Sequence, residues 1–168
     1  MEQKKRYICL FVENEIGVLA RISGLFSSKS YNMDSLSVGE TEDPTVSRMT
    51  ISLTSDDRTF EQIKKQLNRS VEVIKVVDYT DIPIHMKELM FIKIGSCSEK
   101  DKAEIFRIVQ VFGVSVRDYS KTTVLLECIQ TEDRNRELIA LMSEMFVNRI
   151  EVVRGGGVAI EAVSIAER

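Results

Sequence analysis

Hydrophobic and polar positions along this chain follow two periods, and the periods succeed one another in a fixed order. Alternation with a period of two, or a short apolar run, predicts strands at residues 7–12, 33–38, 49–54 and 71–79. Spacings of three and four residues predict amphipathic helices whose apolar faces begin at Val18 and at Phe60. The predicted order up to residue 79 is therefore strand, helix, strand, strand, helix, strand.

The same order returns in the second half of the chain, offset by roughly 80 residues, which indicates an internal duplication. Strands are predicted at 89–94, 114–116, 123–129 and 150–153, and helices carry Ile105 and Leu138 on their apolar faces. Residues 81–87 have no clear period and hold a proline and the single histidine, so they predict a linker. The expected domains are thus 1–80 and 88–168.

Three consecutive glycines, 155–157, follow the last predicted strand. No Lys-Ser/Thr pair and no helix comes after them, so they do not match a phosphate-binding loop. We expect them to form a turn.

This order of elements predicts an α+β fold of two ferredoxin-like βαββαβ units, each an antiparallel sheet with helices on one face. The first strand is apolar on both of its faces, since Tyr7, Cys9 and Phe11 alternate with residues that are also apolar. A strand of this kind must be buried on both sides. Either the second unit or another copy of the chain must cover it, and we expect a homodimer.

Composition narrows the classes of protein. The chain has 168 residues, 43% of them hydrophobic and 29% charged, which is typical of a globular protein. The net charge is -3 with both signs interspersed, so nucleic acid is not expected as the main partner. No signal peptide and no apolar run long enough to cross a membrane is present, so we expect a cytoplasmic protein.

Residues suited to catalysis are few. His85 is the single histidine, and the three cysteines are far apart without a CxxC pair, so no metal site is predicted. Cys9 and Cys128 lie in apolar strands and read as core residues, whereas Cys97 lies in a polar loop and its role is open. No nucleophile elbow or dinucleotide fingerprint occurs. The chain is not expected to be an enzyme by itself.

The corner between the first strand and the first helix is a candidate binding site. A helix that begins near Gly17 presents the unpaired N–H groups of Gly17, Val18 and Leu19 together with the positive end of its dipole, which suits a carboxylate. Glycine lets a ligand approach the backbone closely. Asn14 offers both donors and an acceptor beside this helix end.

Asn32 has the same dual capacity at the start of the next strand. In a dimer, the Asn14 corner of one copy can face the second strand of its neighbour and hold a small zwitterion between them. The apolar side chain of that ligand would contact Ile16 or Met33. The alternative is that both asparagines are turn residues, which is common for asparagine.

Four ordered motifs then point to a family: E-N-E-x-G-V-L-A-R at 13–21, G-L-F-S at 24–27, Y-N-M-D-S-L at 31–36 and D-P-T-V-S-R-M-T at 43–50. This stretch closely resembles the regulatory small subunit of acetolactate synthase, also called acetohydroxyacid synthase. The second half resembles the family in length and layout. The resemblance implies an ACT domain followed by a ferredoxin-like C-terminal domain.

It also implies a function. Subunits of this family bind a catalytic large subunit, raise its activity and confer feedback inhibition by valine, sometimes also by leucine or isoleucine. Thiamine diphosphate, Mg²⁺ and FAD belong to that partner, which makes a precursor of the branched-chain amino acids. Two alternatives are a free-standing ACT-domain sensor that regulates another enzyme or transcription, and a small enzyme on a ferredoxin-like fold.

The resemblance assigns the effector site to Asn14, Gly17 and Asn32. Many members have glycine where this chain has Ser30, and if that position needs a positive φ, serine costs on the order of 1 kcal/mol. Arg48 has two interpretations, a contact with the catalytic subunit or an ion pair at a strand edge.

Overall fold

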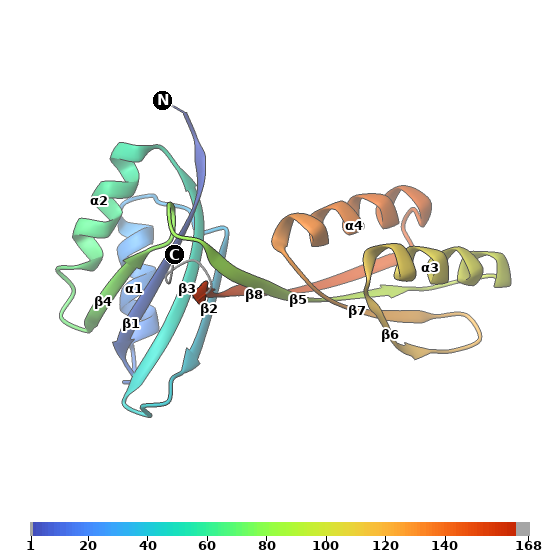
Figure 1. Cartoon of the computed structure of the whole chain (residues 1–168), viewed down its shortest axis with the longest axis horizontal. Coiled ribbons are helices and arrows are strands. Elements are labelled where there is room, and N and C mark those ends of the chain that lie inside the picture. Colours follow the sequence, from blue (N-terminus) through green and yellow to red (C-terminus); the bar gives the residue numbers. More distant parts are fainter. Residues whose placement is uncertain (1, 164–168) are drawn as a thin grey trace. The chain divides into compact units, whose positions relative to one another are not determined.

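Two compact units make up the computed structural model of the protein, which describes residues 2–163 (Figure 1). The first unit contains β1 (Lys4–Glu13), α1 (Val18–Ser28), β2 (Ser35–Glu40), β3 (Val46–Ser55), α2 (Asp57–Leu67) and β4 (Val73–Asp78). The second contains β5 (Ile84–Ile94), α3 (Glu99–Phe112), β6 (Ser115–Tyr119), β7 (Val124–Gln130), α4 (Glu132–Met145) and β8 (Ile150–Glu161).

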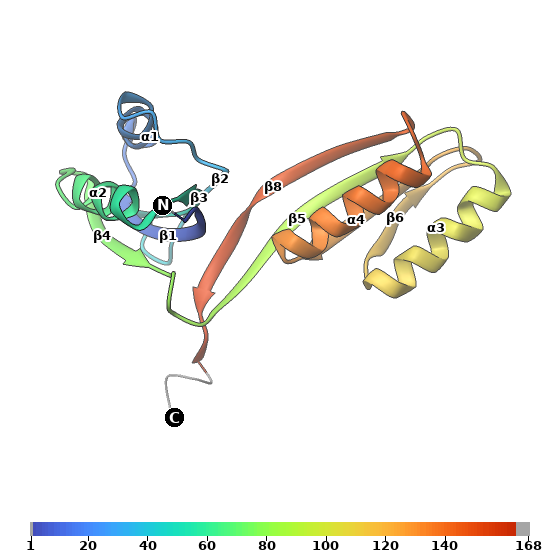
Figure 2. The same ribbon diagram turned by 90° about the horizontal axis from the view of Figure 1, so that it is seen from above.

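Each unit has one four-stranded sheet, with strand order β2-β3-β1-β4 in the first and β6-β7-β5-β8 in the second. The pairings of β1 with β3 and β4, of β2 with β3, and of β7 with β5 and β6 are antiparallel. Two helices lie on one face of each sheet (Figures 1 and 2). The predicted α+β fold of two ferredoxin-like units is confirmed.

The main core of each unit lies between its sheet and its helices. In the first unit Ile8, Leu10 and Val12 of β1 are fully buried against the apolar faces of α1 and α2. The second unit buries the equivalent positions of β5 and β7 against α3 and α4. Cys9 and Cys128 are buried core residues as predicted, and Cys97 is buried as well.

The other face of the first sheet, opposite α1 and α2, is here called the open face. Cys9 is fully buried on it together with Tyr79 and Ala159, and residues 82–86 contribute further apolar side chains. Ala159 belongs to β8, and all of these residues belong to the first unit. The chain itself therefore covers β1, and the burial of this strand does not require a second copy.

The domain boundaries differ from the predicted ones. Within the described residues, the first unit extends to Met86 and also includes residues 156–163, while the second spans Lys87–Gly155. Ile84 to Lys87 lie inside β5 and not in a linker. The sequence gives little sign of this, because Ile84 and Met86 are the only apolar residues of the stretch and the charged Glu88, which the structure buries, interrupts their alternation.

The glycines 155–157 lie inside β8, so the predicted turn is wrong. Close packing explains why glycine is needed here. A Cβ on Gly156 would lie 2.8 Å from the backbone oxygen of Leu36 and 2.6 Å from Oγ of Ser37. The end of β8 approaches β2 more closely than any side chain would allow.

We expect Gly156→Ala to lower the free energy of unfolding by about 1–3 kcal/mol, because the added methyl group meets a backbone oxygen that cannot move away easily. Thermal unfolding followed by circular dichroism measures the change. Gly155→Ala is the matched control, since its Cβ would lie 3.4 Å from the nearest atom, an ordinary contact. Equal stability of the Gly156 variant and the wild-type protein would contradict this packing.

Candidate functional site

The N-terminus of α1 is the only one among the four described helices without a side-chain cap. Its N-cap is Gly17, with φ 87°, and its first turn holds no acidic residue. In contrast Asp56, Ser98 and Thr131 cap α2, α3 and α4 with their side chains. Because a helix N-terminus attracts negative charge, the beginning of α1 is left open to an external anion.

The predicted N–H groups are largely unpaired. No carbonyl in the described part of the chain accepts a hydrogen bond from the backbone N–H of Gly17 or Leu19. The N–H of Val18 donates to the carbonyl of Glu15 at 3.4 Å, near the limit of a hydrogen bond. Helix α1 begins at Val18, one residue later than expected.

The Asn14 side chain is engaged within the chain. Its Nδ2 donates to the carbonyl of Pro44 at 2.9 Å, and its Oδ1 accepts from Oγ of Ser47 at 2.9 Å. A second contact, from Nδ2 to Oε2 of Glu40, is long at 3.5 Å. Asn14 therefore closes the loop between β2 and β3, as the turn alternative supposed, and keeps one weakly used N–H and one lone pair for a ligand.

A pocket of about 240 Å³ lies beside this corner, which we call the α1 pocket. Of the predicted residues, Asn14, Val18 and Leu19 line it. Ile16 and Gly17 lie outside its lining, and the Ile16 side chain is fully exposed. The size suits a ligand below the usual range of roughly 300–1,000 Å³ for drug-sized molecules.

Eight of the eleven lining residues of the α1 pocket were missed by the sequence reasoning, and three of the eight are the glutamates 13, 15 and 40. Val38, on β2, adds an apolar wall with 47% of its surface exposed, and Glu40 adds a carboxylate at the end of the same strand. A carboxylate near an uncapped helix end is what a zwitterion needs for its ammonium group. The polar run 40–44 looked like an ordinary turn, so no local signal marked Glu40.

Asn32 lies beyond the other end of α1. It lines a different pocket, of about 230 Å³, together with Ser30, Tyr31 and residues of β3 and α2. Its side chain is exposed and has no hydrogen bond to any other described residue. Met33 is half-buried against the core of the first unit and lines neither pocket.

One copy of the chain therefore does not bring the predicted site together. Helix α1 has 11 residues, which corresponds to a length of about 16 Å. Asn14 lies at its beginning and Asn32 beyond its end, in separate pockets. A small amino acid cannot reach both within one chain.

The end of α1 is a Schellman motif with serine at the position where glycine is usual. The N–H of Tyr31 donates to the carbonyl of Phe26 at 3.0 Å, and the N–H of Ser30 donates to that of Ser27 at 3.0 Å. The rings of Phe26 and Tyr31 meet edge to face at 6.5 Å, the hydrophobic contact of this motif. Ser30 has φ 56°, so this position does adopt the positive φ that the sequence had left as a condition.

Arg48, on β3, reaches across the open face. Its Nε donates to Sγ of Cys9 at 3.0 Å, and its Nη2 donates to Oη of Tyr79 at 2.6 Å and to the carbonyl of Ala159 at 2.9 Å. It forms no ion pair with any described carboxylate, so the ion-pair interpretation is wrong. Contact with a catalytic subunit stays a prediction.

Two family models match nearly the whole chain. The AHAS small subunit-like ACT domain matches residues 8–75, and the small subunit of acetolactate synthase matches residues 87–163. The acetolactate synthase small subunit of Aquifex aeolicus is 40% identical over 157 residues, covering 94% of this chain and 81% of the relative. The chain belongs to the acetolactate synthase small-subunit family. The corresponding protein of Bacillus subtilis is 36% identical, with coverages of 92% and 89%.

A solved structure agrees with this membership. The acetolactate synthase small subunit of Thermotoga maritima superposes with a TM-score of 0.83 at 31% identity, covering 95% of this chain and 98% of that one. The predicted resemblance to the acetolactate synthase small-subunit family is confirmed for both halves. Within residues 2–163, no helix combines the length and the apolar character that crossing a membrane requires.

We expect Ser30→Gly to raise the free energy of unfolding by about 0.5–1 kcal/mol. Removing the strain of the left-handed conformation stabilises the folded chain by about 1–2 kcal/mol. The greater conformational freedom of glycine in the unfolded chain offsets only about 0.5–1 kcal/mol of this. Urea titration measures the change. Ser23→Gly, inside α1, is the control and is expected to lower the stability. A loss of stability in both variants would contradict strain at Ser30.

Proposed function

We propose that this chain is the regulatory subunit of an acetolactate synthase. In this proposal it binds the catalytic large subunit, raises its activity and confers feedback inhibition by valine, with leucine and isoleucine as further effectors. The large subunit carries out the reaction and holds thiamine diphosphate, Mg²⁺ and FAD. The chain contributes no catalytic residue, and the complex works in the cytoplasm.

The main support for the effector site is that the N-terminus of α1 has no side-chain cap. The effector carboxylate would accept hydrogen bonds from the N–H groups of Gly17 and Leu19, where no side chain competes for them. Its ammonium group would approach Glu40, on the rim of the α1 pocket. The branched side chain would contact Leu19 and Val38, which are 43% and 47% exposed.

A second copy supplies the rest of the site in this proposal. Because Asn14 and Asn32 lie at opposite ends of α1, they meet around one ligand only if two copies pair with the Asn32 end of one against the Asn14 end of the other. The fully exposed Ile16 side chain would then be covered by the partner copy. Such a pairing creates two equivalent sites in a symmetric dimer.

Regulation follows from linkage. An effector changes the activity of the complex only if it binds one arrangement of the two copies more tightly than another, and typical coupling energies are about 1–3 kcal/mol. The affinity for a ligand that contacts both copies depends directly on how the two copies are arranged. Selectivity among branched side chains should be modest, because one methylene group contributes roughly 1–3 kcal/mol in an apolar pocket.

We expect Asn32→Ala to abolish valine inhibition while the large subunit is still activated. This variant tests the site sharply, since the Asn32 side chain has no hydrogen bond within the described chain and its loss should not disturb the fold. Asn14→Ala and Gly17→Asp should act in the same way. The measurement is acetolactate formation by the reconstituted complex, with and without valine.

Asn68→Ala is the matched control, because it removes another exposed asparagine amide of the first unit. The control should remain as sensitive to valine as the wild-type protein. Wild-type sensitivity of the Asn32 or Gly17 variant would show that the effector binds elsewhere. Failure of the wild-type chain to bind or activate a large subunit would overturn the proposed function as a whole.

A further inference from the structure

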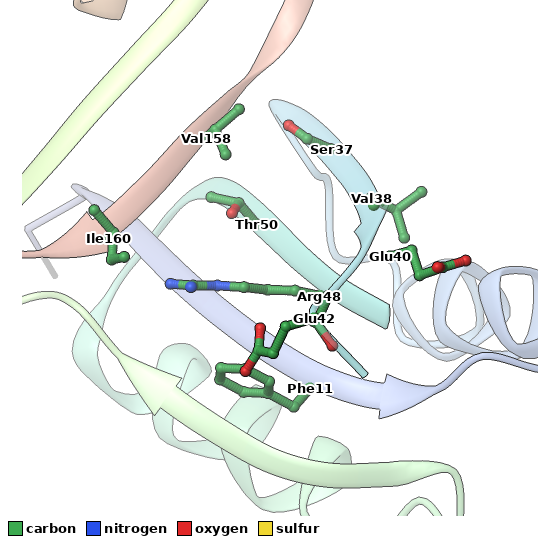
Figure 3. Close-up of a pocket in the computed structure, with 11 residues that line it drawn as sticks. Phe11, Ser37, Val38, Glu40, Glu42, Arg48, Thr50, Val158 and Ile160 are labelled. Carbon is green, nitrogen blue, oxygen red and sulfur yellow. The ribbon is translucent and has the colours of Figure 1, made fainter. Parts of the chain in front are cut away.

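A larger cavity, of about 620 Å³, lies on the open face of the first unit, on the side of the sheet away from α1 and α2 (Figure 3). We call it the open-face cavity. Its floor is formed by side chains of β1 and β3, and one wall by the end of β8. The lining includes Phe11, Arg48, Thr50, Val158 and Ile160. Val38 and Glu40 line both this cavity and the α1 pocket, whereas Arg48, Thr50 and the β8 residues line only this cavity.

The guanidinium of Arg48 brings a positive charge into the cavity, and no ion pair joins it to Glu40 or Glu42, the two carboxylates that line the same cavity. Its three hydrogen-bond acceptors are a thiol, a phenol and a backbone carbonyl, all of them uncharged groups. These bonds use Nε and Nη2, and both N–H groups of Nη1 are left over. A half-buried cation with neutral partners favours an anion in the space before it.

Thr50 provides a second polar group. It is 5% exposed, and its hydroxyl has no hydrogen-bond partner among the described residues. Thr50 and Arg48 both project from β3 into the open-face cavity, two residues apart on the same face of the strand (Figure 3). The hydroxyl is open to the cavity, so it can donate a hydrogen bond to a ligand oxygen.

The other walls are mixed: Ser37, Thr41, Glu40 and Glu42 make one side polar, and the side formed by β8 and Phe11 is apolar. Val158 and Ile160 of β8 are 66% and 58% exposed, although each faces the cavity, and Phe11 lies beneath the guanidinium with 5.2 Å between its ring centroid and the guanidinium carbon. Figure 3 shows the two β8 side chains across from Arg48. An occupant that buries these side chains must carry an apolar body next to its anionic group.

We propose that the open-face cavity is a binding site for a small carboxylate with a short apolar body. The carboxylate accepts from Nη1 of Arg48 and from Oγ1 of Thr50, and the hydrocarbon part packs between Phe11 and the side chains of Val158 and Ile160. A dianion such as phosphate fits less well, because two glutamates also line the cavity. The site needs neither a second copy nor a catalytic partner.

Two sources share this chemistry, a 2-oxo acid and a free amino acid. Titration of the full-length chain with isovalerate, 2-oxoisovalerate and L-valine, followed by NMR of the Ile, Leu and Val methyl groups, distinguishes them. We expect isovalerate to shift the methyl signals of Val158 and Ile160 with a Kd on the order of 1 mM. Tighter binding of valine than of isovalerate would identify an amino-acid site, and the reverse would identify a site for amine-free acids.

Thr50→Val should weaken isovalerate binding roughly tenfold, because it removes one hydrogen bond to a charged group while the volume is kept. Its thermal stability should stay at or above the wild-type value, since the hydroxyl has no partner to lose. Arg48→Lys should weaken binding at least as much. Thr54→Val, an exposed threonine on the same strand, is the matched control and should bind as the wild type does.

Three results would overturn the proposal. The first is the absence of shifts at Val158 and Ile160 up to about 10 mM ligand, which would leave an acidic side chain of a protein partner as the occupant of the cavity. The second is shifts confined to Ile16 and Leu19, which would place the ligand at the effector corner. The third is wild-type affinity in Thr50→Val.

Discussion

The two-sided burial of β1 is the constraint on which the rest of the first unit depends. One face of this strand packs under α1 and α2, and the other must also be shielded from water because it is equally apolar. The chain provides that shield by bringing the end of β8 back over the open face. Arg48 binds the returning strand through its carbonyl at Ala159, and Gly156 lets it approach β2 without a side chain in between.

Neighbouring residues of β3 contact both the end of β8 and the Asn14 side chain at the effector corner. Ser47, which donates to Oδ1 of Asn14, is adjacent in β3 to Arg48, which binds the end of β8. The effector corner and the open-face cavity adjoin at the edge strand β2, where Val38, Gly39 and Glu40 line both pockets. A change in the loop after β2 therefore has a short structural route to the strand that enters the second unit. Coupling along this route needs two arrangements of the strand with different affinities for the effector.

The two candidate sites attract anions by different means. At the beginning of α1 the donors are backbone N–H groups that no side chain caps, next to the weakly used amide of Asn14. In the open-face cavity the donor is a guanidinium whose partners are all neutral. Backbone N–H groups carry only partial charges, so selectivity for the ligand side chain would come from the apolar residues around them. The guanidinium carries a full positive charge. Two sites with such different donors can hold related ligands with different affinities.

The sequence by itself determined the α+β class, the duplicated βαββαβ order and the family, because these depend on local periodicity and on contiguous motifs. It showed that Ser30 departs from the glycine of many family members, but not that this position has a positive φ. It could not show that the glycines 155–157 lie within a strand, since the close contact that requires glycine at position 156 is with Leu36 and Ser37, more than a hundred residues away. Nor could it show that the side chain of Asn14 bonds to Pro44 and Ser47, while that of Asn32 has no hydrogen bond to any described residue. Only the tertiary structure decides which side chains find partners, because hydrogen bonding and close packing join residues that are distant along the chain.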